Sequence, residues 1–393
     1  MLFIGCVMTA GAQKKEIALA KDNVKAGKSL AEAEASMRKL LADSANRDNE
    51  KIWIVLFDAV RKQYEGFNEK MYLKQKIDTA QLFLTTVRMF DVLEGLDSVD
   101  AKPDKKGRIS LKYRKRHADY LNQLRTNLFN GGLFFVKNKD YVKAYDCFAS
   151  YVNCAEQPMF ASFDYANTDS RLNKAGFYTV YSGYKSKNAI NTLRYANYAQ
   201  KDSASLDLTL QYMAETYRNE RDTVKWLEVL ELGVKKYQRS DYFFSHLFDY
   251  YFKSRNLDKA NAICDNAIKA DSADVIALFA KSAVLLAEKK YDECIKVCDR
   301  VISYDEKHAD AYFNAGLSYY NQAVDIESTN KHSREKREMM KTFYRKAMPY
   351  MQKFRQLAPQ EQSQWAMPLY TIYLNLNMGK EFAEIDSLIR NKK

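Results

Sequence analysis

Apolar residues recur along the chain at helical spacing and with a longer period of about 34 residues. Residues three or four positions apart share one face of a helix, so the recurring positions define two facing stripes. The first stripe carries Ala214, Phe248, Ser282 and Gly316, followed three residues later by Tyr217, Tyr251, Leu285 and Tyr319. The second stripe carries Trp226, Ala260 and Cys294, followed one turn later by Leu230, Cys264 and Cys298. This pattern predicts an antiparallel helical hairpin that repeats once per period.

The fourth hairpin is interrupted. One period after Cys294 its second helix should reach the equivalent position at Ser328, but the matching residue is Ala347. The extra residues, 324–342, are mostly polar and basic. We expect two overlong helices here, joined by a tip near Ser328, Thr329 and Asn330.

Other segments repeat the hairpin less completely. The offsets reappear in Gly132, Phe135, Tyr141, Ala144, Phe148 and Tyr151. A degenerate unit is expected at 174–200, helices without a clear consensus at 52–64 and 79–96, and a last helix pair at 365–388 broken at Gly379. Ser29 and Glu32 have the spacing of a capping box that opens a helix. The predicted domains are a signal peptide (1–12), divergent N-terminal hairpins (13–118) and the repeat array (119–393) with its insertion at 324–342, and 101–107 is the predicted linker.

Composition supports long helices. The chain has only 5 Pro and 13 Gly in 393 residues, so few positions break an element. Hydrophobic residues make up 47%, which excludes a chain disordered by composition. The 28 Tyr suit rings that pack across helix seams with their hydroxyls at the edge. The predicted fold class is all-α.

The repeating unit resembles the tetratricopeptide-repeat (TPR) family. The family pattern is an aromatic residue, Leu-Gly and Tyr on the first helix, with Ala, an aromatic residue and Ala on the second, and a final Pro. Matching positions are Tyr312, Ala315, Gly316, Tyr319, Ala347 and Pro359, and also Gly132, Tyr141, Ala144 and Phe148. Trp226 and Cys294 depart from it, and most units lack the Pro. The extended hairpin and the 365–382 ending are similar to repeat proteins exported by Gram-negative bacteria.

The resemblance implies a right-handed superhelix of stacked hairpins, an α-solenoid, whose concave face, lined by first helices, binds peptides or partner domains. The residues expected to line this groove are Gln211, Glu215, Arg218, Tyr242, Ser245, Asp249, Lys253, Phe279, Asp310, Phe313 and Tyr320. Some members grip a C-terminal carboxylate with Lys and Asn. Those offsets hold Ser245, Phe279, Phe313, Asp249, Ala283 and Leu317 here, so that clamp is absent. The alternative is a solvated inner face without a ligand.

The net charge of +12 is concentrated in two segments. Residues 101–117 carry an excess of seven positive charges and residues 331–346 an excess of five, so the rest of the chain is neutral. Arg114, Lys115 and Arg116 form the candidate basic patch. It is either a solvated surface or a contact for an acidic partner, an anionic envelope surface or nucleic acid. Nucleic acid is disfavoured if the protein is exported.

The first twelve residues are apolar and end in Ala10-Gly11-Ala12, the small-x-small pattern that precedes signal-peptidase cleavage. This predicts export to the periplasm or envelope, with a mature chain beginning at Gln13. The run is too short to span a bilayer. The alternatives are a frayed apolar start on a cytoplasmic protein, or lipidation at Cys6.

Catalytic and cofactor motifs are not evident. Cys264, Cys294 and Cys298 occupy repeat-core positions, and packing explains them better than a metal. Cys147 and Cys154 are interpreted in the same way, with a disulfide between them as the alternative. The four His residues are scattered, and Ala26-Gly27-Lys28-Ser29 lacks the first glycine of a phosphate loop. We therefore expect no enzyme activity, cofactor or metal.

These observations favour a non-catalytic adaptor that binds a partner protein or peptide in its concave groove. The alternative function is a structural or cargo-handling component of an export or cell-surface assembly.

Overall fold

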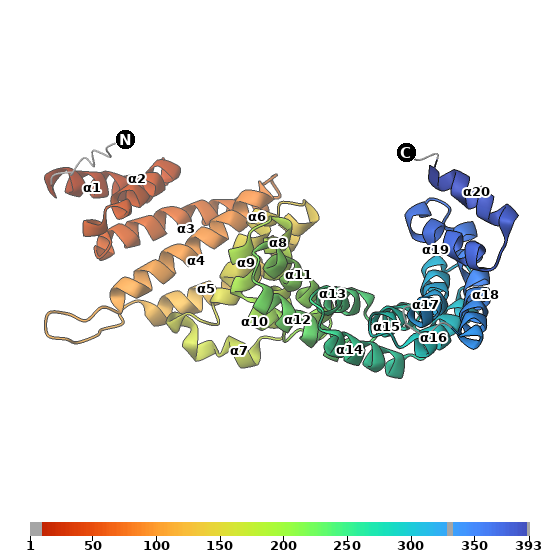
Figure 1. Cartoon of the computed structure of the whole chain (residues 1–393). Coiled ribbons are helices and arrows are strands. Elements are labelled where there is room, and N and C mark those ends of the chain that lie inside the picture. The colour runs from red at the N-terminus through yellow and green to blue at the C-terminus, as the bar shows by residue number, and fades with distance from the viewer. Residues whose placement is uncertain (1–9, 328–332, 391–393) are drawn as a thin grey trace. The chain divides into compact units, whose positions relative to one another are not determined.

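The computed structural model describes residues 10–327 and 333–390, and within these ranges the regular structure is helical without strands (Figure 1). The chain forms two compact units that divide between Trp226 and Leu227. In each unit, successive helices run as antiparallel hairpins that stack on the next hairpin, so the predicted all-α repeat fold is confirmed.

The first unit holds α1 (Ala10–Ala26), α2 (Leu30–Ala42), η1 (Ser44–Asn46), α3 (Glu50–Tyr72), α4 (Thr79–Asp100), α5 (Arg114–Lys137), α6 (Tyr141–Asn153), η2 (Pro158–Phe163), α7 (Tyr165–Thr168), α8 (Leu172–Lys185), α9 (Ala189–Arg194), α10 (Ala196–Ala199) and α11 (Leu206–Asn219). Helix α12 (Thr223–Lys236) crosses the division. The second unit continues with α13 (Asp241–Lys253), α14 (Leu257–Ala270), α15 (Val275–Ala287), α16 (Tyr291–Tyr304), α17 (Ala309–Glu327), α18 (Arg334–Leu357), α19 (Gln362–Asn375) and α20 (Gly379–Arg390).

The repeating apolar positions lie in the core. Ala214 and Ser282 of the first stripe are fully buried, as are Cys264, Cys294 and Cys298 of the second. Little space is left at Gly316, because a Cβ there would lie 3.0 Å from Cγ of Met351 on the partner helix. The predicted repeat offsets are therefore confirmed as packing positions.

One contact recurs with the repeat. In three hairpins a lysine at the start of the second helix places its ammonium 5.0–5.8 Å from the ring of an aromatic residue near the end of the first helix. The pairs Phe135 with Lys143, Tyr217 with Lys225, and Tyr251 with Lys259 are each eight residues apart. Tyr319 and Lys346 make the same contact with the predicted insertion, 324–342, lying between them in the sequence.

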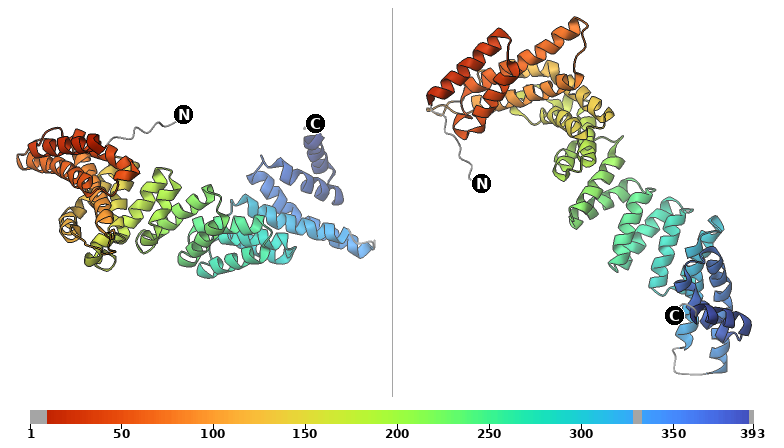
Figure 2. Two further views of the ribbon diagram at one scale, coloured as in Figure 1. Left: turned by 90° about the vertical axis from the view of Figure 1, so that its left-hand side faces the viewer. Right: turned by 90° about the horizontal axis from the view of Figure 1, so that it is seen from above.

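The insertion lengthens both helices of its hairpin. Helix α17 has 19 residues and α18 has 24, and the two lie side by side, in light blue in Figure 2. Two overlong helices were predicted, and the described residues confirm them. The predicted tip, Ser328 to Asn330, lies outside the described residues.

The turns inside the hairpins use charged residues in the left-handed region. Arg221, Arg255 and Lys289 stand at equivalent positions, each with φ of 60°. The next amide then reaches back to the helix, as in the 2.9 Å bond from Asn256 N–H to the Tyr251 carbonyl. In the tail, this conformation falls on Asn377, with φ of 55°, two residues before the predicted break at Gly379.

The predicted capping box at Ser29 is wrong. Helix α2 does begin at Leu30, but Ser29 has φ of 47° and its side chain caps nothing. The preceding Gly27 also has positive φ, so the turn between α1 and α2 holds Ser29 away from N-cap geometry.

The loop 101–113 joins α4 to α5 and contains the predicted linker. The expected boundary after residue 118 falls inside α5. One core runs through the first unit from Ala20 to Tyr198, on both sides of that position.

Candidate functional site

The predicted groove residues of the second unit begin on α13. Ser245, Asp249 and Lys253 are exposed on one stripe, whereas Phe243, Phe244, Leu247 and Tyr251 point into the packing. The ion pair along the stripe is local, from Lys253 Nζ to Asp249 Oδ2 at 2.8 Å. Tyr242 begins the stripe, with its ring 4.6 Å from that of His246. Helix α13 therefore has a solvent-exposed polar stripe, and these contacts of its residues are made within the helix.

Three predicted residues lie on α11 in the first unit. Gln211 donates to Asp207 at 3.1 Å, and Arg218 pairs with Glu215 at 2.7 Å. Arg218 is exposed, whereas Gln211 and Glu215 are partly covered. This stripe is polar and mixed in charge, like that of α13.

The remaining predicted residues are Asp310, at the start of α17, and three aromatic residues in packing contacts. Asp310 lies in the first turn of α17. Phe313 packs on Phe354 with ring centres 4.9 Å apart, and Tyr320 lies 5.8 Å from Tyr344, both across the α17–α18 hairpin. Phe279 is half-buried against His308 at 4.8 Å. These three aromatic rings pack against neighbouring residues. The predicted groove residues that remain open to solvent are therefore mainly the polar ones.

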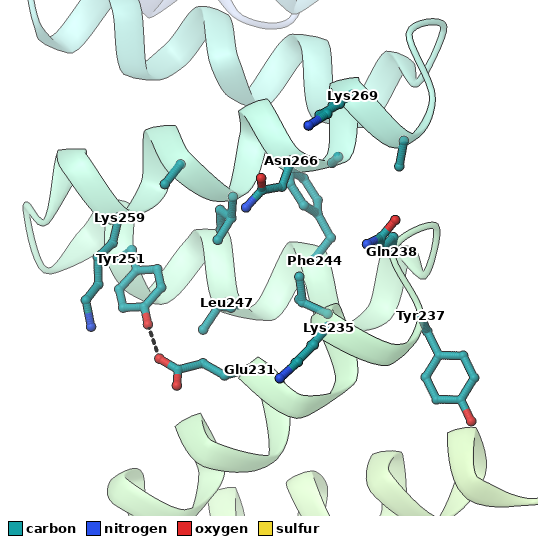
Figure 3. A pocket seen from close by; sticks show the side chains of 15 residues that line it. Glu231, Lys235, Tyr237, Gln238, Phe244, Leu247, Tyr251, Lys259, Asn266 and Lys269 are labelled. Atoms are coloured by element: carbon teal, nitrogen blue, oxygen red, sulfur yellow. Dashed lines mark hydrogen bonds between the residues drawn. The ribbon is translucent and has the colours of Figure 1, made fainter. Parts of the chain in front are cut away.

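A pocket that the sequence did not predict lies within the second unit (Figure 3). It has a volume of about 670 Å³ and sits between α12 and α14, with α13 as its floor. The floor is the buried stripe of Phe244, Leu247 and Tyr251. Both walls belong to second helices of successive hairpins, whereas the predicted groove residues lie on first helices. Helix α13 contributes to both, with different residues.

Polar groups surround this apolar floor. Tyr251 donates its hydroxyl to Glu231 at 2.5 Å, and burial, reinforced by this bond, raises the pKa of the tyrosine above its usual value. Polar side chains complete the rim: Lys235, Gln238, Lys259, Asn266 and Lys269. Arg239, which follows the lining residue Gln238, donates to the carbonyl of the lining residue Ala270 at 3.2 Å. A signal was present in the sequence, because Lys235 and Lys269 stand one repeat period apart.

The predicted basic patch is reduced by an ion pair. Arg114 makes two bonds, of 2.8 and 2.9 Å, to the buried carboxylate of Asp97, which holds the pKa of the guanidinium above its usual value. Lys115 and Arg116 are exposed. Arg114 thus ties α5 to α4, and two of the three predicted cations face solvent.

The five cysteines among the described residues are buried free thiols. Burial raises the pKa of Cys147 and of Cys264 to about 12, so both are protonated at neutral pH. Packing was predicted for these residues, and it is confirmed. In residues 10–327 and 333–390, the acidic, His and Cys side chains form no cluster of three or more that could hold a metal ion.

No helix in the described ranges combines the length and apolarity needed to cross a membrane. No protein-family model matches the sequence, and no curated protein matches it.

Several solved structures are similar to the chain, and three of them are described here. The C-terminal part of a TPR repeat-containing protein from Cytophaga hutchinsonii has 12% identity and a TM-score of 0.43, covering 65% of this chain and 92% of its own. YrrB, described as a TPR protein with an unusual peptide-binding site, has 18% identity and a TM-score of 0.35, covering 52% and 98%. MamA has 17% identity and a TM-score of 0.32, covering 44% and 95%. All three scores are below 0.5, so these similarities add no argument about function.

Proposed function

We propose that the chain is a non-catalytic tetratricopeptide-repeat adaptor that binds a segment of a partner protein on its first-helix face. The observation that carries this proposal is the α13 stripe of Ser245, Asp249 and Lys253, which is exposed between two packed faces of the same helix. Stacked hairpins repeat such faces along an array, and an extended array surface suits docking of a peptide or domain.

The chemistry of the stripe favours a polar segment. Asp249 and Lys253 present opposite charges one helical turn apart, and Tyr242 adds an aromatic edge. Mixed charge with aromatic residues is common where proteins meet proteins. The packed rings of Phe279 and Phe313 belong to hairpin stability in this proposal and not to partner contact.

Panning a random peptide library against the full chain tests this function. We expect the selected peptides to bind the purified chain with micromolar dissociation constants. Changing Ser245→Arg together with Asp249→Arg should weaken that binding at least tenfold. A double change away from the stripe, Lys296→Glu on α16 with Lys307→Glu in the following loop, is the control and should leave binding unchanged. If the first-helix variant binds all selected peptides normally, the first-helix site is wrong; if no peptide is selected, the adaptor function is wrong.

We also propose that the adaptor works in the bacterial periplasm or envelope, because the Ala10-Gly11-Ala12 motif fits a cleavage site. Residues 1–9 of that predicted signal lie outside the described residues. Expression with the native N-terminus in a Gram-negative host, followed by fractionation and mass measurement, should give a periplasmic chain that starts at Gln13. A cytoplasmic chain that retains Met1 would contradict export.

A further inference from the structure

We propose that the pocket between α12 and α14 docks a second kind of segment: a short acidic stretch of a partner protein with one apolar side chain at its centre. Its walls are second helices, and its floor uses other residues of α13 than the stripe of Ser245, Asp249 and Lys253. The two proposed sites can therefore be tested separately.

The length of the pocket suits an extended peptide. Phe244, Leu247 and Tyr251 follow one another along α13, and the last lies seven positions after the first, which is about 10 Å of helix. An extended chain advances about 3.3 Å per residue, so the floor accommodates about three residues. The middle of the floor is Leu247, and the neighbouring walls are apolar at Val234 and Ile263. An apolar side chain is therefore expected at the centre of the segment.

The charges of the pocket select an acidic ligand. Lys259 lies at the Tyr251 end, Lys269 lies at the opposite end, and Lys235 extends from the facing wall (Figure 3). Within the described chain none of these ammonium groups has an ion-pair partner, although Lys259 also lies 5.0 Å from the Tyr251 ring. The one lining carboxylate, Glu231, accepts a hydrogen bond from Tyr251. Glu231 thus offsets the charge of Lys259 at the Tyr251 end, and the three lysines and one carboxylate of the lining leave a net charge of +2. This net charge complements an acidic ligand.

The amide side chains favour a peptide over a simple amphipathic anion. Gln238 and Asn266 extend from two different elements toward the pocket, and each offers both a donor and an acceptor. A peptide backbone presents the same pair of groups at each residue. A fatty acid has one carboxylate and no amide, so it would match neither the net charge of +2 nor the two amides.

The test uses a capped pentapeptide with a central leucine and two glutamates on each side, labelled with a fluorophore, in a polarisation titration with the full chain. We expect binding that weakens at least tenfold when leucine is replaced by serine or the glutamates by lysine. Affinity should also fall as the salt concentration rises from low to high, because exposed charges are screened.

Two pocket variants localise the site. Lys235→Glu with Lys269→Glu reverses two rim charges, and Ala262→Trp fills the opening from a lining position on α14. Each should reduce affinity at least tenfold, whereas the charge-matched control Lys296→Glu with Lys307→Glu should not. Circular dichroism will confirm that all variants stay helical.

Three results would overturn the proposal: no saturable binding of the acidic peptide, equal binding to both pocket variants, or binding of laurate in place of the peptide. The acidic peptide could fail to bind while the library-selected peptides still require Ser245 and Asp249. That result would remove the pocket proposal and leave the adaptor function intact. The reverse result would retain the pocket and remove the first-helix site.

Discussion

Gly132 and Gly66 offer the same substitution in two opposite environments of the first unit. Both lie inside helices, Gly132 in α5 and Gly66 in α3. A Cβ at Gly132 would lie 2.5 Å from Cζ and 2.6 Å from Cδ2 of Phe148, whereas a Cβ at Gly66 would meet nothing within 4 Å. We predict that Gly132→Ala destabilises the unit and that Gly66→Ala stabilises it.

The magnitude follows from what Phe148 can do. Carbon atoms pack about 3.5–4.0 Å apart, so the ring must move by about 1 Å to admit the methyl group. That ring is fully buried and stacked on Tyr178 at 4.8 Å, with Phe129 against its edge at 5.6 Å. Overpacking at such a site costs about 3 kcal/mol. Alanine regains about 1 kcal/mol of helix propensity, which leaves a net loss of about 2 kcal/mol. At Gly66 only the gain of about 1 kcal/mol remains.

Urea denaturation followed by circular dichroism gives the sign of each change. Because repeat arrays unfold in parts, hydrogen exchange of peptides from α5, α6 and α3 should accompany it. Faster exchange in α5 and α6 is expected for Gly132→Ala, with unchanged or slower exchange in α3 for Gly66→Ala. A stabilising effect of Gly132→Ala would refute the close packing described here.

Other predictions concern a turn, a buried cation and a buried acid. Arg255→Gly should raise stability by about 0.5–1 kcal/mol, because glycine relieves the left-handed conformation. Lys296→Gly, at an exposed position inside α16, should lower it by about 0.7 kcal/mol, and urea midpoints compare the two variants. Arg125→Ala should lower the free energy of unfolding by about 3–5 kcal/mol in the same assay. The guanidinium lies 3.7 Å from the ring of Tyr151 and 3.8 Å from that of Tyr165, and it pairs with Asp169 at 2.7 Å. A loss below about 1 kcal/mol would contradict this prediction. Burial, followed by the charge of nearby carboxylates, raises the pKa of Glu94 to about 8. The folded chain therefore favours the protonated, neutral carboxyl of Glu94. The free energy of unfolding should fall by up to about 5 kcal/mol as the pH rises from 4.5 to about 8. Glu94→Gln should flatten that dependence in denaturation at several pH values, and equal slopes would exclude the assignment.

The repeat period was enough to predict the hairpins, the insertion and the buried second-helix cysteines. These features depend on helical spacing, which the positions of apolar residues record directly. The turns were less predictable. One break was predicted at Gly379, but the positive φ of the hairpin turns, which the sequence did not predict, falls on Arg221, Arg255 and Lys289. Backbone hydrogen bonds back to the helix hold a conformation that these side chains do not favour.

The site was harder to predict because exposure depends on neighbouring helices. Phe313 and Tyr320 have first-helix spacing, yet Phe354 and Tyr344 of the lengthened α18 pack against them. The pocket could not be predicted from the sequence, because its walls come from two different hairpins. In the sequence the only sign of the pocket is that Lys235 and Lys269 lie one repeat period apart. This spacing alone does not show that a pocket lies between α12 and α14.

Site-specific photo-crosslinking tests the adaptor function most directly. Benzoylphenylalanine replaces Ser245 in one sample and Lys296 in a control, and each purified chain is irradiated with a library-selected peptide. The proposed function predicts a covalent adduct at position 245 that unlabelled peptide competes away, and little adduct at 296. No adduct at 245, or equal adducts at both positions, would contradict docking on the first-helix face.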